Sequence, residues 1–400
     1  MRKLWVIVIA GLLAVMVFAG CTENKPAAKK EKAAAKEAPV GILADVGSVD
    51  RILCAHSVID SATKKKYWVM EELDFSGNVV RSYTSAEQNL QGAQTPTYNA
   101  NGTYCVFSAN LGQGWDLLVS RCEDGSKPNR MTDANDNLEP HFIPSGRSIV
   151  LLVIRKKGAR DGNIMNFVLE RGSAETITAT ESDQNVVLST DGKWVTFDRA
   201  EKGGRQVYVL RVDGSRLIKL TSGAGDHVQP SFSPDGKWVA YELRMGKNST
   251  IHMVNVDRTG EKELGSGTAP AISPDGNWIA AAPVDVKNGT CVVYPVAGGT
   301  SRNLLNGEPN LVSRVKWSPA SDKAAALDAT GHVVIVSVAD GTKLGASRDG
   351  NYGDVVFSPA TKGEVIINCF GQKLIDKNKI ATGQAGAEKT TEMNNGVAAG

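Results

Sequence analysis

Short apolar runs alternate with glycine-rich turns along most of the chain, and this alternation is the main structural signal in the sequence. Runs such as Trp194–Phe197 and Trp238–Tyr241 follow directly after Asp-Gly turns. Aromatic and β-branched residues favour strands, and Asp-Gly favours tight reversals of the chain. After the first twenty residues, no stretch has the 3.6-residue periodicity of an amphipathic helix. The pattern therefore predicts an all-β protein built from short antiparallel strands.

The same local pattern recurs at a regular interval. An apolar residue is followed by a polar turn, most clearly Ser-Pro-Asp-Gly at 233–236 and 273–276, and then by a second apolar run. The seven leading apolar residues are Tyr98, Phe142, Leu188, Phe232, Ile272, Trp317 and Phe357. Successive leading residues are 40 to 46 positions apart, which is the period of a β-propeller blade.

Each copy has segments for four antiparallel strands, so seven copies predict a seven-bladed propeller. Segments 51–57, 67–74 and 79–84 read as strands before the first copy, and 352–376 carries the first two strands of the last one. We expect these N- and C-terminal strands to pair and close the ring, because closure removes exposed sheet edges. Eight blades are the alternative if residues 41–47 form a degenerate inner strand.

The Ser-Pro-Asp-Gly copies resemble the TolB-type, WD40-like β-propeller repeat. The resemblance covers about residues 95–370 and is best at 188–221 and 227–264. It implies the propeller fold and the family role of docking to the peptidoglycan-associated lipoprotein and the Tol envelope machinery. About thirty residues separate Cys21 from the first expected strand, so the α/β domain that precedes the propeller in TolB is not expected here.

The first twenty residues have the features of an export signal. Arg2 and Lys3 precede an uncharged apolar run at 4–18, which is shorter than the ~20 residues that span a bilayer. The run ends in Phe-Ala-Gly-Cys at 18–21, which resembles the cleavage box of bacterial lipoproteins. The resemblance implies a lipid anchor, with palmitate among its acyl chains, on Cys21. An ordinary secretory signal followed by a chance cysteine is the alternative.

The segment behind this cysteine is rich in Ala, Lys and Glu and cannot bury an apolar core, so residues 21–45 are expected to be a solvated tether. By the same resemblance, Thr22 in place of Asp favours the outer membrane, with the protein facing the periplasm. The expected domain order is a signal peptide at 1–20, the tether, a propeller at 46–376 and a disordered tail at 377–400.

Charge excludes a nucleic acid as the partner. The chain has 45 Lys and Arg against 43 Asp and Glu, and loss of the two basic residues of the signal balances the charges. No basic stripe with interleaved aromatic residues occurs in the sequence. We expect a monomer that reaches the membrane through its lipid anchor.

Polar residues at three consecutive inner strands form the candidate binding site, because inner strands surround the channel of a propeller. His141 and His227 are its distinctive members, since imidazoles and carboxylates hold a divalent cation or a sugar acid. A cluster of solvated loop residues is the alternative, and no cofactor is required. The candidates are Asp136, Asn137, Glu139, His141, Asp183, Asn185, Asp226, His227 and Gln229.

The sequence contains no G-x-S-x-G, H-E-x-x-H or C-x-x-C motif. Trp194, Trp238 and Trp278 recur at the blade period and predict packing rather than a platform for sugars. We therefore predict a non-catalytic propeller that binds an envelope protein or peptidoglycan. A carbohydrate-binding or oligosaccharide-lyase type of propeller, with a polar or metal-binding channel mouth, is the alternative.

Five cysteines remain beside Cys21, and export permits their oxidation. If the ring closes as expected, Cys54 and Cys369 come from the two joining ends, so a disulfide between them is a hypothesis. Buried free thiols are the alternative.

Overall fold

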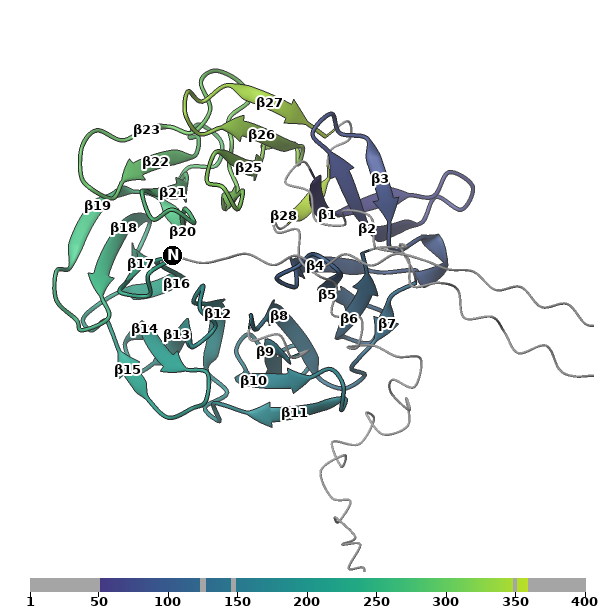
Figure 1. Cartoon of the computed structure of the whole chain (residues 1–400), viewed down its shortest axis with the longest axis horizontal. Coiled ribbons are helices and arrows are strands. Elements are labelled where there is room, and N and C mark those ends of the chain that lie inside the picture. The colour runs from purple at the N-terminus through teal and green to yellow at the C-terminus, as the bar shows by residue number, and fades with distance from the viewer. Residues whose placement is uncertain (1–50, 123–126, 145–148, 348–350, 359–400) are drawn as a thin grey trace, which may run out of the picture. The chain divides into compact units, whose positions relative to one another are not determined.

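Seven four-stranded antiparallel sheets stand as blades around a central axis in the computed structural model (Figure 1). The structure describes residues 51–122, 127–144, 149–347 and 351–358. Helical structure in this described part is limited to a short 3-10 turn at Ala86–Gln88. The predicted all-β fold and the count of seven blades are confirmed.

Each blade runs from an inner strand at the channel to an outer strand at the rim. Blade 1 contains β28 (Tyr352–Phe357), β1 (Arg51–Ile59), β2 (Lys66–Asp74) and β3 (Val79–Ser82). Blade 2 contains β4 (Gly92–Tyr98), β5 (Tyr104–Asn110), β6 (Trp115–Arg121) and β7 (Asn129–Arg130). Blade 3 contains β8 (Asp136–Phe142), β9 (Ile149–Arg155), β10 (Asn163–Val168) and β11 (Ser173–Thr176). Blade 4 contains β12 (Asp183–Leu188), β13 (Trp194–Glu201), β14 (Gly204–Arg211) and β15 (Leu217–Lys219).

The second half of the ring repeats this order. Blade 5 contains β16 (Asp226–Phe232), β17 (Trp238–Met245), β18 (Asn248–Asn255) and β19 (Lys262–Ser266). Blade 6 contains β20 (Thr268–Ile272), β21 (Trp278–Ala282), β22 (Val292–Pro295) and β23 (Arg302–Asn303). Blade 7 contains β24 (Lys316–Trp317), β25 (Lys323–Leu327), β26 (Val333–Ser337) and β27 (Lys343–Ala346). Every inner strand ends at one of the seven leading apolar residues of the repeat.

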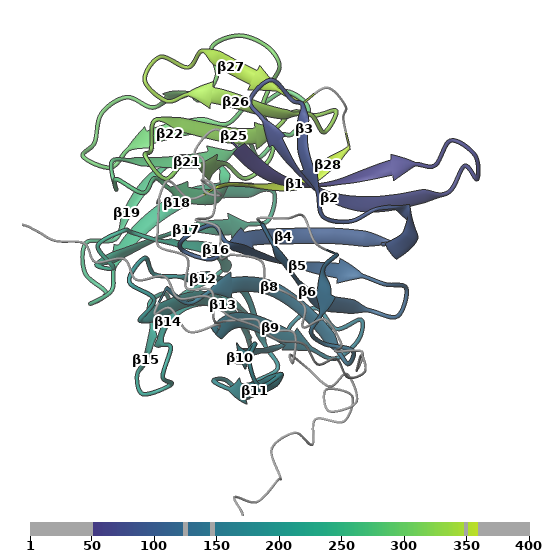
Figure 2. The same ribbon diagram turned by 45° about the vertical axis from the view of Figure 1, so that its right-hand side comes forward.

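The two ends of the described chain close the ring. β28 pairs antiparallel with β1, with Ile52 opposite Phe357, and the N–H of Ser358 donates to the carbonyl of Arg51 at 3.1 Å. The two strands lie side by side in both views of the molecule (Figures 1 and 2). The predicted pairing of N- and C-terminal strands is confirmed.

The closing blade takes three strands from the N-terminal side and one from the C-terminal side. β1, β2 and β3 confirm the strands predicted at 51–57, 67–74 and 79–84. Together with β28 they complete a four-stranded sheet, so this blade does not require the second strand predicted within 352–376. That strand, the segment 41–47, the signal, the tether and the C-terminal tail lie outside the described residues.

Apolar side chains are buried mainly between blades. The described part contains seven clusters of buried apolar residues, and each cluster combines side chains of two neighbouring blades. Trp194, Trp238 and Trp278 pack against the clusters at the 4–5, 5–6 and 6–7 interfaces respectively, which confirms their predicted packing role. Full burial of one large apolar side chain stabilises a fold by about 1.5–3 kcal/mol, so the ring is held chiefly at these interfaces.

The serine of the Ser-Pro-Asp-Gly turn explains why the motif recurs. Ser233 accepts the N–H of Trp238 at 3.0 Å and donates its hydroxyl hydrogen to Asp235 at 2.8 Å. Gly236 has φ 67°, in the left-handed region where glycine has no steric penalty. Equivalent contacts are made by Ser189, Ser273 and Ser318. The turn thereby fixes where the second strand of the blade begins.

Four cysteines fall in the described part, and all are buried free thiols: Cys54, Cys105, Cys122 and Cys291. Cys54 lies on β1, and burial raises the pKa of its thiol. Cys369 lies outside the described residues, so its disulfide with Cys54 stays a prediction. No helix among the described residues is long and apolar enough to cross a bilayer.

We predict that β28 is required for a stable ring. A chain that ends at residue 350 loses Val355 and Phe357, which are at most 4% exposed, and uncovers Ile52 on β1. The melting temperature should fall by on the order of 10 °C, because several large side chains lose their packing. A chain that ends at Ser358 is the matched control and should melt as the full chain does. Equal melting of the two truncated chains in calorimetry would show that closure contributes nothing.

Candidate functional site

The central channel is the candidate site. It has a volume of about 740 Å³, and residues of all seven blades line it. Its walls come from the inner strands, each of which lies at the edge of its sheet and faces the channel with that edge. Trp317, Ile272 and Leu327 supply apolar surface, and several charged and amide side chains lie among them.

One position of the repeat forms a ring of seven side chains in this channel. It lies three residues before the leading apolar residue of each inner strand. The seven side chains all line the channel, and from blade 2 round to blade 1 they are Thr95, Glu139, Asn185, Gln229, Ala269, Arg314 and Asp354. We call this set the channel ring. Six of its seven members are polar or charged.

A β-bulge places five members of the channel ring. In blades 2 to 6 the pairing of the inner strand with the second strand shifts at this position. The ring residue there has a positive φ, between 50° and 54°, and a proline follows it in four of the five blades. A bulge re-aims side chains and leaves N–H groups outside the ladder.

Acidic side chains accept the N–H groups that the bulges release. Asp354 accepts the N–H of Thr95 at 3.0 Å, and Glu139 accepts the N–H of Val186 at 2.6 Å. Both acids belong to the channel ring, and each caps the bulge of the next blade. At the following two interfaces the acid comes from the second strand, where Asp198 accepts from Gln229 and Glu242 accepts from Ala269. The bulges therefore also join neighbouring blades.

Arg314 is the cation of the channel ring, and it makes no ion pair with the described residues. Its Nη2 donates to the carbonyls of Pro230 and Pro270 at 3.2 and 3.1 Å, but no carboxylate of the described residues lies within 4.0 Å of it. In contrast, Lys316 in the same wall pairs with Asp354 at 3.2 Å. Burial lowers the pKa of Arg314, although a guanidinium keeps its proton at neutral pH.

Two titratable groups of the channel lining, His141 and Glu139, have shifted pKa values. Burial lowers the pKa of His141 to about 4, and the neighbouring cations Lys316 and Arg314 act in the same direction. His141 is therefore neutral at pH 7. Burial also raises the pKa of Glu139, an effect opposed by the N–H groups of Val186 and Asn185.

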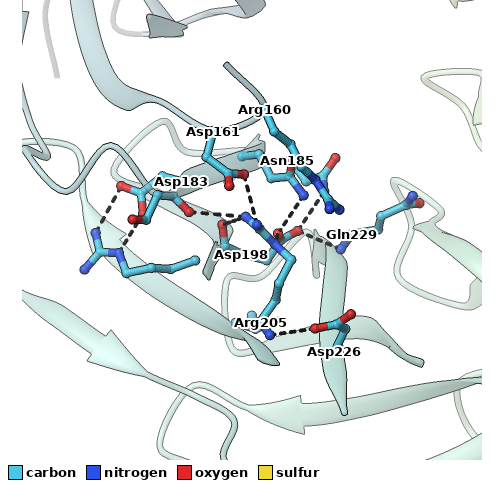
Figure 3. Close-up of polar contacts among 12 residues, drawn as sticks. Arg160, Asp161, Asp183, Asn185, Asp198, Arg205, Asp226 and Gln229 are labelled. Carbon is cyan, nitrogen blue, oxygen red and sulfur yellow. Dashed lines mark hydrogen bonds and ion pairs between the residues drawn. The ribbon is translucent and has the colours of Figure 1, made fainter. Parts of the chain in front are cut away.

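Beside the channel, a charged network joins blades 3, 4 and 5 (Figure 3). Its centre is Asp198, which is fully buried and accepts hydrogen bonds from the Arg205 guanidinium and from the Asn185 amide. Arg205 also pairs with Asp161 at 2.9 Å, and its N–H donates to Asp226 at 2.8 Å. Burial raises the pKa of Asp198, and the Arg205 guanidinium opposes this rise.

The nine predicted site residues divide into two groups. Glu139, His141, Asn185 and Gln229 line the channel, so the structure brings these four together. The other five lie outside the channel lining and make contacts within or between blades. Asp136 accepts the N–H groups of Trp115 and Gly158, and the Asn137 amide donates to the carbonyls of Trp115 and Ala134. Asp183 binds the Arg199 guanidinium through both carboxylate oxygens, and Asp226 accepts the N–H of Arg205. His227 is the fifth of these residues.

His227 is the main difference from the expected channel mouth. It is the second residue of β16, is only 4% exposed, and lies beside Tyr241 with the ring centroids 5.6 Å apart. His141 lies near the end of its strand and lines the channel. A β-bulge lies between these two repeat positions and shifts the alternation of side chains by one residue, so the two histidines do not share a surface. Among the described residues, no three His, Cys, Asp or Glu side chains gather in a group that would hold a metal ion.

Sequence reasoning missed Thr95, Arg314, Lys316 and Asp354. The available signal was positional, since counting back three residues from each leading apolar residue finds the whole channel ring. The position is hard to find in blade 7, because β24 has only two residues and its turn lacks the Asp-Gly of blades 4, 5 and 6.

The protein is thus a closed seven-bladed β-propeller with a polar central channel. The TolB beta propeller domain family matches residues 57–321, more than half of the chain, and the chain belongs to that family. A curated relative, the Tol-Pal system protein TolB of Francisella tularensis, is 32% identical over 113 residues, which is 26% of this chain and 26% of that protein. The chain thus matches about a quarter of the length of this relative.

Solved structures share the fold at low identity. A puromycin-hydrolysing peptidase of Mycobacterium tuberculosis has a TM-score of 0.59 at 15% identity, over 74% of this chain and 52% of that one. The oligogalacturonate lyase of Vibrio parahaemolyticus has a TM-score of 0.53 at 13% identity, over 74% and 85% respectively. The propeller therefore occurs both in enzymes and in Tol-Pal components, and these structural similarities support the fold alone.

We predict that Asp198→Asn destabilises the protein by at least about 2 kcal/mol, because it removes the charge that Arg205 faces in a buried site. Lys156→Ala is the control, since the Lys156–Glu181 pair has side chains 74% and 56% exposed, and such pairs contribute about 0–1 kcal/mol. Urea unfolding of both variants gives the comparison. Equal stability of Asp198→Asn and wild type would mean that the network is not structural.

Proposed function

We propose that this protein is an envelope scaffold that binds another envelope protein, and that a lipid on Cys21 anchors it to the outer membrane on the periplasmic side. Its membership of the TolB propeller family supports an envelope role. The observation that carries the proposal is a set of exposed apolar side chains on one face of the propeller. Binding to peptidoglycan is the competing outcome.

In an antiparallel blade, the connections between the second and third strands all lie on one face of the ring. Blade 5 has Met245 on this connection, 50% exposed, and blade 6 has Val284 and Val286, 39% and 50% exposed. Ile59 of blade 1 lies on the equivalent connection. Exposed apolar side chains gathered on one face are typical of a protein-binding surface. We call Met245, Val284 and Val286 the docking patch.

The loop that carries two members of the docking patch is braced internally. Asp285 accepts the N–H of Lys287 at 2.9 Å and the side-chain amide of Asn288 at 2.7 Å, and its carbonyl accepts the N–H of Gly289 at 2.8 Å. Such contacts hold a loop in one conformation. A pre-organised loop loses little conformational entropy on binding, which favours a role for this loop as a contact surface.

We predict that Met245→Ser combined with Val286→Ser weakens binding of the partner by tenfold or more, since about 1–3 kcal/mol per buried anchor is lost. Cross-linking in intact cells through a photoreactive residue at position 287 identifies the partner, and titration of the purified partner measures the loss. Leu344→Ser is the control, because Leu344 is 46% exposed on an outer strand. A loss caused equally by Leu344→Ser, or a cross-link to peptidoglycan alone, would contradict the proposed protein partner.

The anchor has a separate test. Cys21→Ala should move the protein from the membrane fraction to the soluble periplasmic fraction, because the acyl chains supply about 0.8 kcal/mol per buried CH₂. Wild type should label with a fatty-acid analogue, whereas the variant should not. Continued sedimentation of an unlabelled variant with membranes would show that something other than a lipid holds it there.

A further inference from the structure

We propose that the central channel is a binding site for an organic carboxylate and that Arg314 holds the carboxylate. This proposal goes beyond the scaffold function, because it concerns the inside of the ring and not the docking patch. It does not depend on the membrane anchor. It follows from how the charges of the channel are partnered.

The two acids of the channel ring are already engaged. Asp354 accepts the N–H of Thr95 and pairs with Lys316, and Glu139 accepts the N–H of Val186. Arg314 donates its hydrogen bonds only to the carbonyls of Pro230 and Pro270. The charges of Asp354 and Glu139 act on it from beyond ion-pair distance. An anion that enters the channel can therefore supply the direct ion pair that Arg314 lacks.

The guanidinium is also held in a fixed position. Both of its bonds to protein carbonyls use Nη2, and the hydrogen-bond donors Nη1 and Nε have no partner among the described residues. Both paired edges of a guanidinium include Nη2, so the free Nη1 and Nε of Arg314 can each donate a separate hydrogen bond to a carboxylate oxygen. Ala269 is the small member of the channel ring and precedes Arg314 around it, so the neighbouring position carries no bulky side chain.

The rest of the lining fits the remainder of a small polar organic acid. The hydroxyl Oγ1 of Thr95 is buried and has no hydrogen-bond partner among the described residues. The Gln229 side chain extends away from the Asp198 network (Figure 3) and lines the channel. Trp317 supplies an aromatic surface whose Nε1–H is fixed by the carbonyl of Ala271 at 3.0 Å. These groups offer hydrogen bonds and an apolar wall beside the cation.

His141 contributes no charge to the proposed site at pH 7. Because burial and the nearby cations keep its pKa near 4, His141 adds no second positive charge at pH 7. Lys316 already pairs with Asp354, so Arg314 is the cation of the described lining that can form an ion pair with a ligand carboxylate. A terminal carboxylate of a peptide and the carboxylate of a sugar acid both have this chemistry.

The test compares acids with their neutral analogues on the wild-type protein. The probes are N-acetyl-alanyl-alanine against its C-terminal amide, and glucuronic acid against glucose, titrated at low ionic strength with binding followed by calorimetry and by the melting temperature. We expect at least one acid to bind tenfold or more tightly than its neutral analogue. The acid that binds tells which source of carboxylate fits the channel.

Two variants place the binding on Arg314. Arg314→Met should reduce affinity for the acid tenfold or more, and Arg314→Lys, which keeps the charge but loses the separate Nη1 and Nε donors, should give an intermediate loss. Arg211→Met removes one positive charge from the outer part of blade 4, where Arg211 packs over Trp194, and should bind as wild type does.

The proposal is overturned if the neutral analogues bind as tightly as the acids, if no acid binds at tens of millimolar, or if a folded Arg314→Met protein binds unchanged. The comparison of acid and analogue needs no variant, so it decides the matter even if Arg314→Met does not fold. Loss of carboxylate binding would leave the envelope partner untouched, and loss of the partner in the docking-patch variant would leave carboxylate binding untouched.

Discussion

Burial of apolar surface between neighbouring blades is the interaction on which the rest of the structure depends. A four-stranded sheet has two faces, and in this ring each face is covered by the next blade. An open array would leave two faces uncovered, so the sheets gain their full stabilisation only when the circle is complete. The pairing of β28 with β1 supplies that completion. Closure also makes the channel rigid, because no inner strand can move without disturbing two interfaces.

A polar framework follows from the same constraint. Bulges in the inner strands release N–H groups in buried positions, and a buried donor without a partner is costly. The acids Asp198, Glu242, Glu139 and Asp354 each accept one of them across a blade boundary. Much of the polar surface near the channel is therefore used for structure. This explains why several acids that looked like ligands, such as Asp183 and Asp226, are bonded to arginine or to backbone N–H groups instead.

The fold was predictable in detail, whereas the site was predictable only in part. The leading apolar residues located the ends of all seven inner strands. The polar turn that follows each of them is formed by residues next to one another in the sequence, so it can be recognised from the sequence alone. The site depends instead on which way a side chain points after a bulge. His141 and Glu139 lie within the same bulged strand and reach the channel, but His227, near the start of β16, packs on Tyr241. A bulge shifts by one residue the alternation of side chains between the two faces of the sheet. The sequence signal for it is the proline that follows the bulge in four of the five bulged blades.

The repeat separates positions that build the ring from positions that decide what enters it. The Ser-x-Asp-Gly turn and the interface tryptophans recur in blades 4, 5 and 6 because these blades pack against their neighbours in the same way. The side chains of the channel ring line an open space, and the structural contacts that some of them make, such as those of Glu139 and Asp354, do not require the same residue in every blade. Its members accordingly differ from blade to blade, from Ala269 through Gln229 to Arg314. The composition of the channel ring, and not the repeat motif, is therefore where a ligand preference of this propeller would lie, and its one cation, which makes no ion pair with the described residues, is the basis of the proposed carboxylate site.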